Sequence, residues 1–148
     1  LGGVQVRELR PSPRAPIRPS LTAGAADVLA QHPSLESIEL GYTDWVDAAV
    51  LTRLAALPAL AELGLSESQG VADGALGALA KSASLRRLTL VGCRALSIED
   101  LAACAGAPLT ELNLRATRLP EAGVRELAPK FPGCTIVLSD GQRLTVPR

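Results

Sequence analysis

Aromatic side chains are scarce in this sequence, which has one Trp, one Tyr and one Phe among 148 residues. Histidine is equally rare: His32 is the only one, and no cysteine or carboxylate accompanies it at ligand spacing. A metal site is therefore not expected, and we interpret His32 as an ordinary residue at a helix C-terminus. Cys93, Cys104 and Cys134 are odd in number and far apart, which argues against a disulfide framework.

An excess of either charge is also missing. Fifteen basic and fifteen acidic residues balance, and no long run of one sign occurs. Nucleic acid and an anionic membrane are thus not expected as partners. No apolar run approaches the roughly 20 residues that cross a bilayer, and the N-terminus lacks the order of a signal peptide. We expect a soluble, cytoplasmic protein, and a chain that begins at Leu1 without any Met is compatible with a piece of a longer one.

The sequence does contain a repeat. Four segments begin alike, "LESIEL" at Leu35, "LAELGL" at Leu60, "LRRLTL" at Leu85 and "LTELNL" at Leu109, at spacings of 25, 25 and 24 residues. Each fits L-x-x-L-x-L, whose last two leucines share one face of a strand. The run "TIVL" supplies a fifth pair, Ile136 and Leu138.

The agreement continues past each strand. Small residues able to bond a neighbouring backbone follow at one position: Thr43, Ser68, Cys93 and Thr117. Two further apolar positions, three residues apart, predict the buried stripe of a short helix: Leu51, Leu76, Leu101 and Val124, then Leu54, Leu79, Cys104 and Leu127. Ser97 and Asp100 resemble a capping box at a helix start. Each unit therefore predicts a strand, a turn and a helix.

This pattern resembles the leucine-rich repeat family. The run "LRRLTLVGCRALSIEDLAACAG" looks like the cysteine-containing, ribonuclease-inhibitor-like subtype, and the resemblance covers about residues 21–140. It implies an α/β solenoid with a concave parallel β-sheet, convex helices and, most often, a protein-binding role. One unit cannot bury its own apolar face, whereas stacked units bury a continuous core.

The ends of the chain depart from the pattern. We interpret residues 1–148 as one domain, with four repeats over 35–131. Residues 1–34 would form a degenerate N-terminal repeat, with its strand at Val4 and Val6, its helix at "LTAGAADVLAQ" and a Pro-rich insertion at 10–20. Residues 132–148 would form a C-terminal cap, in which Asp140-Gly141 between two alternating runs indicates a β-hairpin.

The parts of the common catalytic sites are not found. Triads and two-metal sites are incomplete, and the Gly-rich run "GALGAL" falls inside a repeat helix without a following Lys-Ser/Thr. Cys93 and Cys104 stand at repeat positions, which favours packing because free cysteine is among the most buried residue types. Cys134 has no clear repeat position, so a reactive and a packing role both stay open. We expect neither an enzyme nor a cofactor.

The concave face is the candidate binding surface. Residues that alternate with the buried leucines form three columns: Ser37, Glu62, Arg87, Glu111 and Thr135; Glu39, Gly64, Thr89, Asn113 and Val137; Gly41, Ser66, Val91, Arg115 and Ser139. Glu39 and Glu62 form an acidic patch at one end, and Arg87 and Arg115 lie toward the other. Candidate partner-binding residues are Glu39, Glu62, Arg87, Glu111, Asn113 and Arg115. The alternative is a solvated sheet whose charges keep the protein soluble.

Two aromatics stand together in "ELGYTDWVDA" at residues 39–48. Tyr42 and Trp45 occupy no registered core position, so we expect them on one rim of the sheet, where exposed Tyr and Trp are enriched at binding hot spots. The alternative is that Trp45 folds over the Pro-rich insertion or over its neighbouring repeat.

Together these features predict a protein–protein interaction module. It would bind a partner protein through the concave sheet and its rim, as a monomer or as the recognition part of a larger signalling or adaptor chain. The alternative is a structural domain that docks on its own chain or self-associates.

Overall fold

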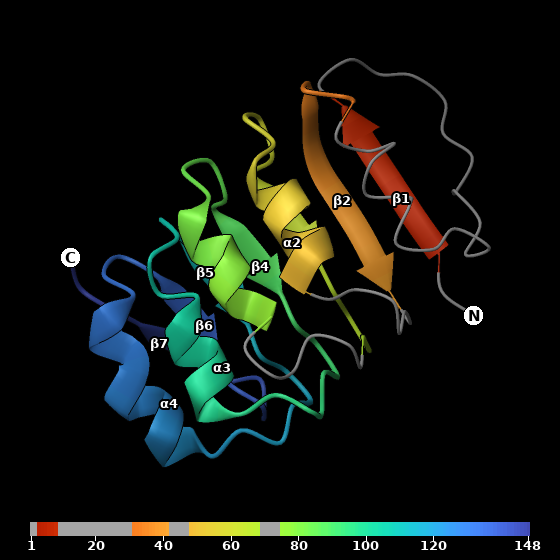
Figure 1. Ribbon diagram of the computed structural model, residues 1–148. Coiled ribbons are helices and arrows are strands. Elements are labelled where there is room, and N and C mark those ends of the chain that lie inside the picture. Colours follow the sequence, from red (N-terminus) through yellow and green to blue (C-terminus); the bar gives the residue numbers. More distant parts are fainter. Residues whose placement is uncertain (1–2, 9–30, 42–47, 69–74) are drawn as a thin grey trace.

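The protein is an α/β fold built from one mostly parallel sheet with helices on one side. The computed structural model describes residues 3–8, 31–41, 48–68 and 75–148. Over these ranges seven strands form a single sheet in chain order, β1 to β7. Figure 1 shows α2, α3 and α4 on the same side of the strands, with β1 and β2 at one end and α4 and β7 at the other.

Five strands run parallel at the repeat spacing of the sequence. They are β2 (Leu35–Gly41), β3 (Glu62–Gly64), β4 (Arg87–Thr89), β5 (Glu111–Asn113) and β6 (Thr135–Val137). The register aligns one apolar residue of every strand: Ile38, Leu63, Leu88, Leu112 and Ile136. The predicted strands and their registration are therefore confirmed.

A helix follows each of the first four parallel strands. These are α2 (Ala48–Ala55), η2 (Ala75–Lys81), α3 (Ile98–Ala103) and α4 (Glu121–Leu127), the last continued by η3 (Ala128–Lys130). The second is a 3-10 helix, at the place where a short helix was predicted. Its Leu76 and Leu79 are both buried, because residues three apart lie on the same side of a helix with three residues per turn.

The core lies between the sheet and the helices. Both leucine positions of every repeat strand are at most 2% exposed: Ile38 and Leu40, Leu63 and Leu65, Leu88 and Leu90, Leu112 and Leu114, Ile136 and Leu138. The two helix positions are buried as well: Leu51, Leu76, Leu101 and Val124, then Leu54, Leu79, Cys104 and Leu127. The apolar columns predicted from the repeat are thus the core of the molecule.

The turn after each strand uses small polar side chains as expected. Ser68 Oγ donates to the Leu40 carbonyl at 2.9 Å, and Cys93 Sγ donates to the Leu65 carbonyl at 2.9 Å. Each therefore ties one unit to the unit before it. Thr117 differs, because its hydroxyl donates to the Leu114 carbonyl of its own turn at 2.7 Å. Thr43 lies outside the described residues.

Helix α3 begins with the predicted capping box. Ser97 accepts from the Asp100 backbone N–H, and the Asp100 carboxylate accepts from the Ser97 N–H at 3.0 Å. Two backbone donors that the first helical turn leaves without a helical partner are satisfied in this way.

The first strand runs in a direction that the repeat does not predict. Val4 and Val6 lie in β1 (Gly3–Glu8), as expected, but β1 pairs with β2 antiparallel, with Val4 opposite Leu40 and Val6 opposite Ile38. A strand of a preceding repeat would have been parallel, so the expectation of a repeat-like N-terminal strand is wrong in direction. An alternating pattern is the same when read from either end, and it therefore leaves strand direction open.

The chain ends in the predicted β-hairpin. Strand β7 (Arg143–Thr145) pairs antiparallel with β6, and Asp140-Gly141 lies in the connection. Gly141 has a φ of 91°, a left-handed conformation that glycine adopts without strain. The Asp140 carboxylate accepts from the Gln142 N–H at 3.0 Å, which closes the turn.

Some expectations fall on residues outside the described part. They are most of the helix predicted at 21–31, the Pro-rich insertion at 10–20, and the rim residues Tyr42 and Trp45. Within the described ranges, the helices are all too short or too polar to cross a membrane.

Replacement of Leu88 by alanine tests the registered core. Leu88 is 1% exposed and belongs to the central strand, so Leu88→Ala should lower the free energy of unfolding by about 2 to 5 kcal/mol. Leu144→Ala provides the matched control, because Leu144 is only partly buried on the edge strand and should cost less. Urea denaturation measures both, and a loss below about 1 kcal/mol at Leu88 would contradict the register.

Candidate functional site

The sheet has one face that the described helices leave uncovered, which we call the open face. The buried apolar residues of each strand point toward the helices, so the residues that alternate with them point the other way. The strand register aligns Ser37, Glu62, Arg87, Glu111 and Thr135 in one column and Glu39, Gly64, Thr89, Asn113 and Val137 in the next. The first two predicted columns are thus present, and they hold most of the candidate site residues.

A polar hollow of about 220 Å³ lies on this face around Gly64. Glu39, Glu62, Arg87 and Glu111 are its charged wall residues. Gly64 is part of its floor and contributes no side chain, whereas Thr89 occupies the same column on the next strand. We call this feature the Gly64 hollow.

The Glu39 carboxylate lies directly over Gly64. A Cβ added at residue 64 would overlap this carboxylate, so the glycine leaves the space that Glu39 occupies. Ser66 donates hydrogen bonds to Glu39 from its hydroxyl and its backbone N–H. Burial nevertheless raises the pKa of the Glu39 carboxyl above its ordinary value, and the two hydrogen bonds only partly oppose this. The ionised Glu39 is therefore incompletely compensated in the free protein.

Arg87 lies between two glutamates of its own column. Its guanidinium is 3.1 Å from Glu62 Oε1 and 3.9 Å from Glu111 Oε2, and the three side chains are between 40% and 59% exposed. The Ser37 hydroxyl also donates weakly to Glu62, at 3.4 Å. Exposed ion pairs of this kind contribute little to stability, so Arg87 can leave them at small cost. With three carboxylates and one guanidinium, the hollow carries an excess of negative charge.

The remaining predicted site residues do not join this cluster. Asn113 and Arg115 lie on or just beyond β5, where Asn113 Oδ1 accepts from the Arg115 N–H at 3.1 Å, and neither lines the hollow. Arg87 was expected toward the basic end of the face, but its ion pairs place it among the glutamates. Tyr42 and Trp45 are outside the described residues.

Gly64 is the functional candidate that the sequence did not single out. It stood in the middle column as one small residue among several. The sequence does hold a clue to Gly64, which is the only residue without a side chain between Glu39 and Thr89 in this column. A side chain directly across from a glutamate on the next strand limits where the glutamate side chain can lie, and glycine imposes no such limit.

The three cysteines are buried, free thiols. Burial raises the pKa of Cys93 to about 11, of Cys104 to about 12 and of Cys134 to about 11. The thiolate is the nucleophile and the metal ligand, and these raised pKa values favour the protonated thiol at neutral pH. Cys134, for which two roles were open, is fully buried, which favours the packing role.

In the described part of the chain, no group of three or more His, Cys, Asp or Glu residues is arranged so that it could hold a metal ion. No protein-family model matches the chain, and no curated protein matches it significantly. The geometry of the open face is accordingly the basis for a functional assignment.

The pH dependence of stability tests the state of Glu39. Because burial raises the pKa of Glu39 in the folded protein, ionisation of this carboxyl destabilises the fold as pH rises above its ordinary pKa of 4.5, and this effect disappears at lower pH. Glu39→Gln should therefore raise the melting temperature at neutral pH, with a gain that vanishes below pH 4.5. Glu126→Gln, at an exposed position of α4, is the matched control and should leave the melting temperature nearly unchanged at neutral pH.

Serine replacements distinguish the two cysteine positions within the repeats. Cys93→Ser should be tolerated, because Ser68 makes the same bond to the preceding unit at the equivalent position. Cys104→Ser should cost more, since the Cys104 thiol is buried among apolar side chains where Leu54 and Leu79 stand in other units. Thermal denaturation compares the two variants, and equal melting temperatures would show that one placement is wrong.

Proposed function

We propose that this chain is a leucine-rich repeat solenoid that acts as a protein-interaction module and binds its partner through the open face of the sheet. Parallel strands at the repeat spacing, a helix after each of the first four, and continuous apolar columns support the repeat architecture. In this proposal the open face is the concave side of the solenoid.

The observation that carries the binding role is the Gly64 hollow. Its floor lacks a side chain, its volume of about 220 Å³ has room for the end of one long side chain, and its walls hold three carboxylates. Burial destabilises the ionised form of Glu39, and a positive charge placed beside its carboxylate would offset this effect. The partner chemistry that fits best is a lysine or arginine side chain on a protein segment.

A binding role also agrees with the state of the nucleophiles. The thiols of Cys93, Cys104 and Cys134 are buried with raised pKa values, so none is activated for attack. Arg87, by contrast, is held only by exposed ion pairs. A cationic side chain of the partner could form an ion pair with Glu62 or Glu111 in place of Arg87. Arg87 would then turn toward solvent or toward a carboxylate of the partner.

A displayed library of random peptides tests this proposal with a defined probe. The native protein should enrich sequences with lysine or arginine, and raising the salt concentration should weaken their binding. Gly64→Thr should lower the affinity of the enriched peptides by at least about tenfold, or about 1.4 kcal/mol. Threonine is the residue that already stands at the paired position 89 on the next strand, and at position 64 it would displace only the flexible Glu39 side chain. The Gly64→Thr variant should therefore keep the fold.

Gly77→Ala is the matched control. Gly77 lies on η2, and a Cβ there would meet only Ala103 Cβ at 3.6 Å, an ordinary contact. This variant should bind the enriched peptides as the native protein does. Enrichment of acidic or neutral peptides, or full binding by Gly64→Thr, would rule out the hollow as the site.

A further inference from the structure

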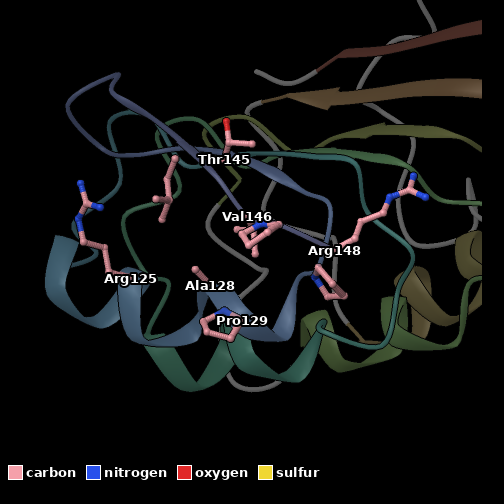
Figure 2. A pocket seen from close by; sticks show the side chains of 9 residues that line it. Arg125, Ala128, Pro129, Thr145, Val146 and Arg148 are labelled. Carbon is pink, nitrogen blue, oxygen red and sulfur yellow. The ribbon is translucent and has the colours of Figure 1, made fainter.

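The last strand borders a second hollow, on the helix side of the sheet. Its volume is about 380 Å³, and it lies between the α4–η3 segment and β7. Pro129, Pro132, Leu144 and Val146 give it an apolar lining, and Figure 2 shows Arg125 and Arg148 on opposite sides of it. We call it the β7 hollow, and it shares no lining residue with the Gly64 hollow.

The position of the β7 hollow follows from how the units stack. In the interior of the sheet, each strand places its apolar side chains against the helix layer and against the next strand. Leu144 lies opposite Ile136 and packs against the core, but it remains partly exposed because β7 is the edge strand of the described sheet. The β7 hollow is therefore the place that a further apolar strand residue would fill.

The edge of β7 also offers backbone hydrogen-bonding groups. Leu138 N–H donates to the Gln142 carbonyl at 2.7 Å, and Val146 N–H donates to the Cys134 carbonyl at 2.9 Å. Backbone groups alternate in direction along an antiparallel strand, so those of Leu144 face β6 as well. The N–H and C=O groups of Arg143 and Thr145 therefore face outward, where an added strand could pair with them.

The charges around this edge favour an acidic strand. Arg125 pairs with Glu121 at 2.8 Å, but Arg143 and Arg148 form no ion pair with any residue in the described ranges. Arg143 is exposed and alternates with Leu144, so it lies on the open face while Leu144 lies on the helix side. A second copy pairing antiparallel edge to edge would bring the free arginines of two chains together, and like charges opposite one another are destabilising.

We propose that the edge of β7 binds an extended protein segment of alternating apolar and acidic residues, which adds to the sheet as one more strand. Main-chain hydrogen bonds to Arg143 and Thr145 hold the segment. Its apolar side chains enter the β7 hollow beside Leu144 and Pro129. Its acidic side chains lie on the open face and pair with Arg143. This site is independent of the Gly64 hollow and of the function proposed for it.

A capped synthetic peptide of about six residues that alternates valine and glutamate is the probe. Titration should shift the amide NMR signals of residues 143–146, while a peptide alternating valine and lysine should not. Thr145→Pro should lower the affinity by at least about tenfold, because it removes an outward-facing donor that the ladder with β6 does not use. Thr145→Val keeps the N–H group, serves as the control and should bind normally.

Reversal of charge gives a second, independent variant if Thr145→Pro fails to fold by circular dichroism. The Arg143→Glu variant should no longer bind the peptide that alternates valine and glutamate, and it should bind the peptide that alternates valine and lysine. The Gly64→Thr variant should bind the glutamate peptide as the native protein does, which separates this site from the open-face hollow.

Three results would overturn the proposal. The first is no binding of the glutamate peptide. The second is equal binding of both peptides by the native protein. The third is self-association of the native protein in sedimentation that Thr145→Pro abolishes, because a second copy would then be the occupant.

Discussion

The structure depends on one registered column of apolar side chains. Ile38, Leu63, Leu88, Leu112 and Ile136 stand opposite one another on five parallel strands, and none is appreciably exposed. Most of these strands have only three residues, too few for any of them to be stable alone. Each unit therefore persists only because its neighbours cover its apolar face.

The same register creates the open face and its hollow. Once the leucines point toward the helices, every intervening residue must point away from them, and residues of successive units stand side by side. Glutamate at 62, arginine at 87 and glutamate at 111 thereby become an ion-pair ladder. Gly64 leaves room for the Glu39 carboxylate in the adjoining column. The strand register that aligns the core leucines thus also brings together charged residues that are 24 or 25 positions apart in the chain.

The two ends of the sheet show what happens where the stacking stops. At the N-terminal end the register pairs β1 antiparallel with β2, and at the C-terminal end the hairpin pairs β7 antiparallel with β6. Strand β7 has three residues and no helix follows it within the described residues, so it covers the neighbouring unit incompletely. Leu144 is left partly exposed and the β7 hollow stays open beside it. The proposed strand-binding site is the consequence of this incomplete cover.

The repeat made the strands, the turn residues and the buried columns predictable from sequence alone, because residues such as Leu88 and Cys93 recur at a fixed spacing and burial follows periodicity. The C-terminal hairpin was predictable from a separate local signal, Asp140-Gly141 between two alternating runs. Other features depended on the tertiary structure. The direction of β1 was open, since alternation has no direction. The position of Arg87 between Glu62 and Glu111, and the fold of Glu39 over Gly64, depend on where long side chains turn once neighbouring units are in place. The burial of Cys134 likewise needed the end of the sheet to be assembled, because no repeat position specified it.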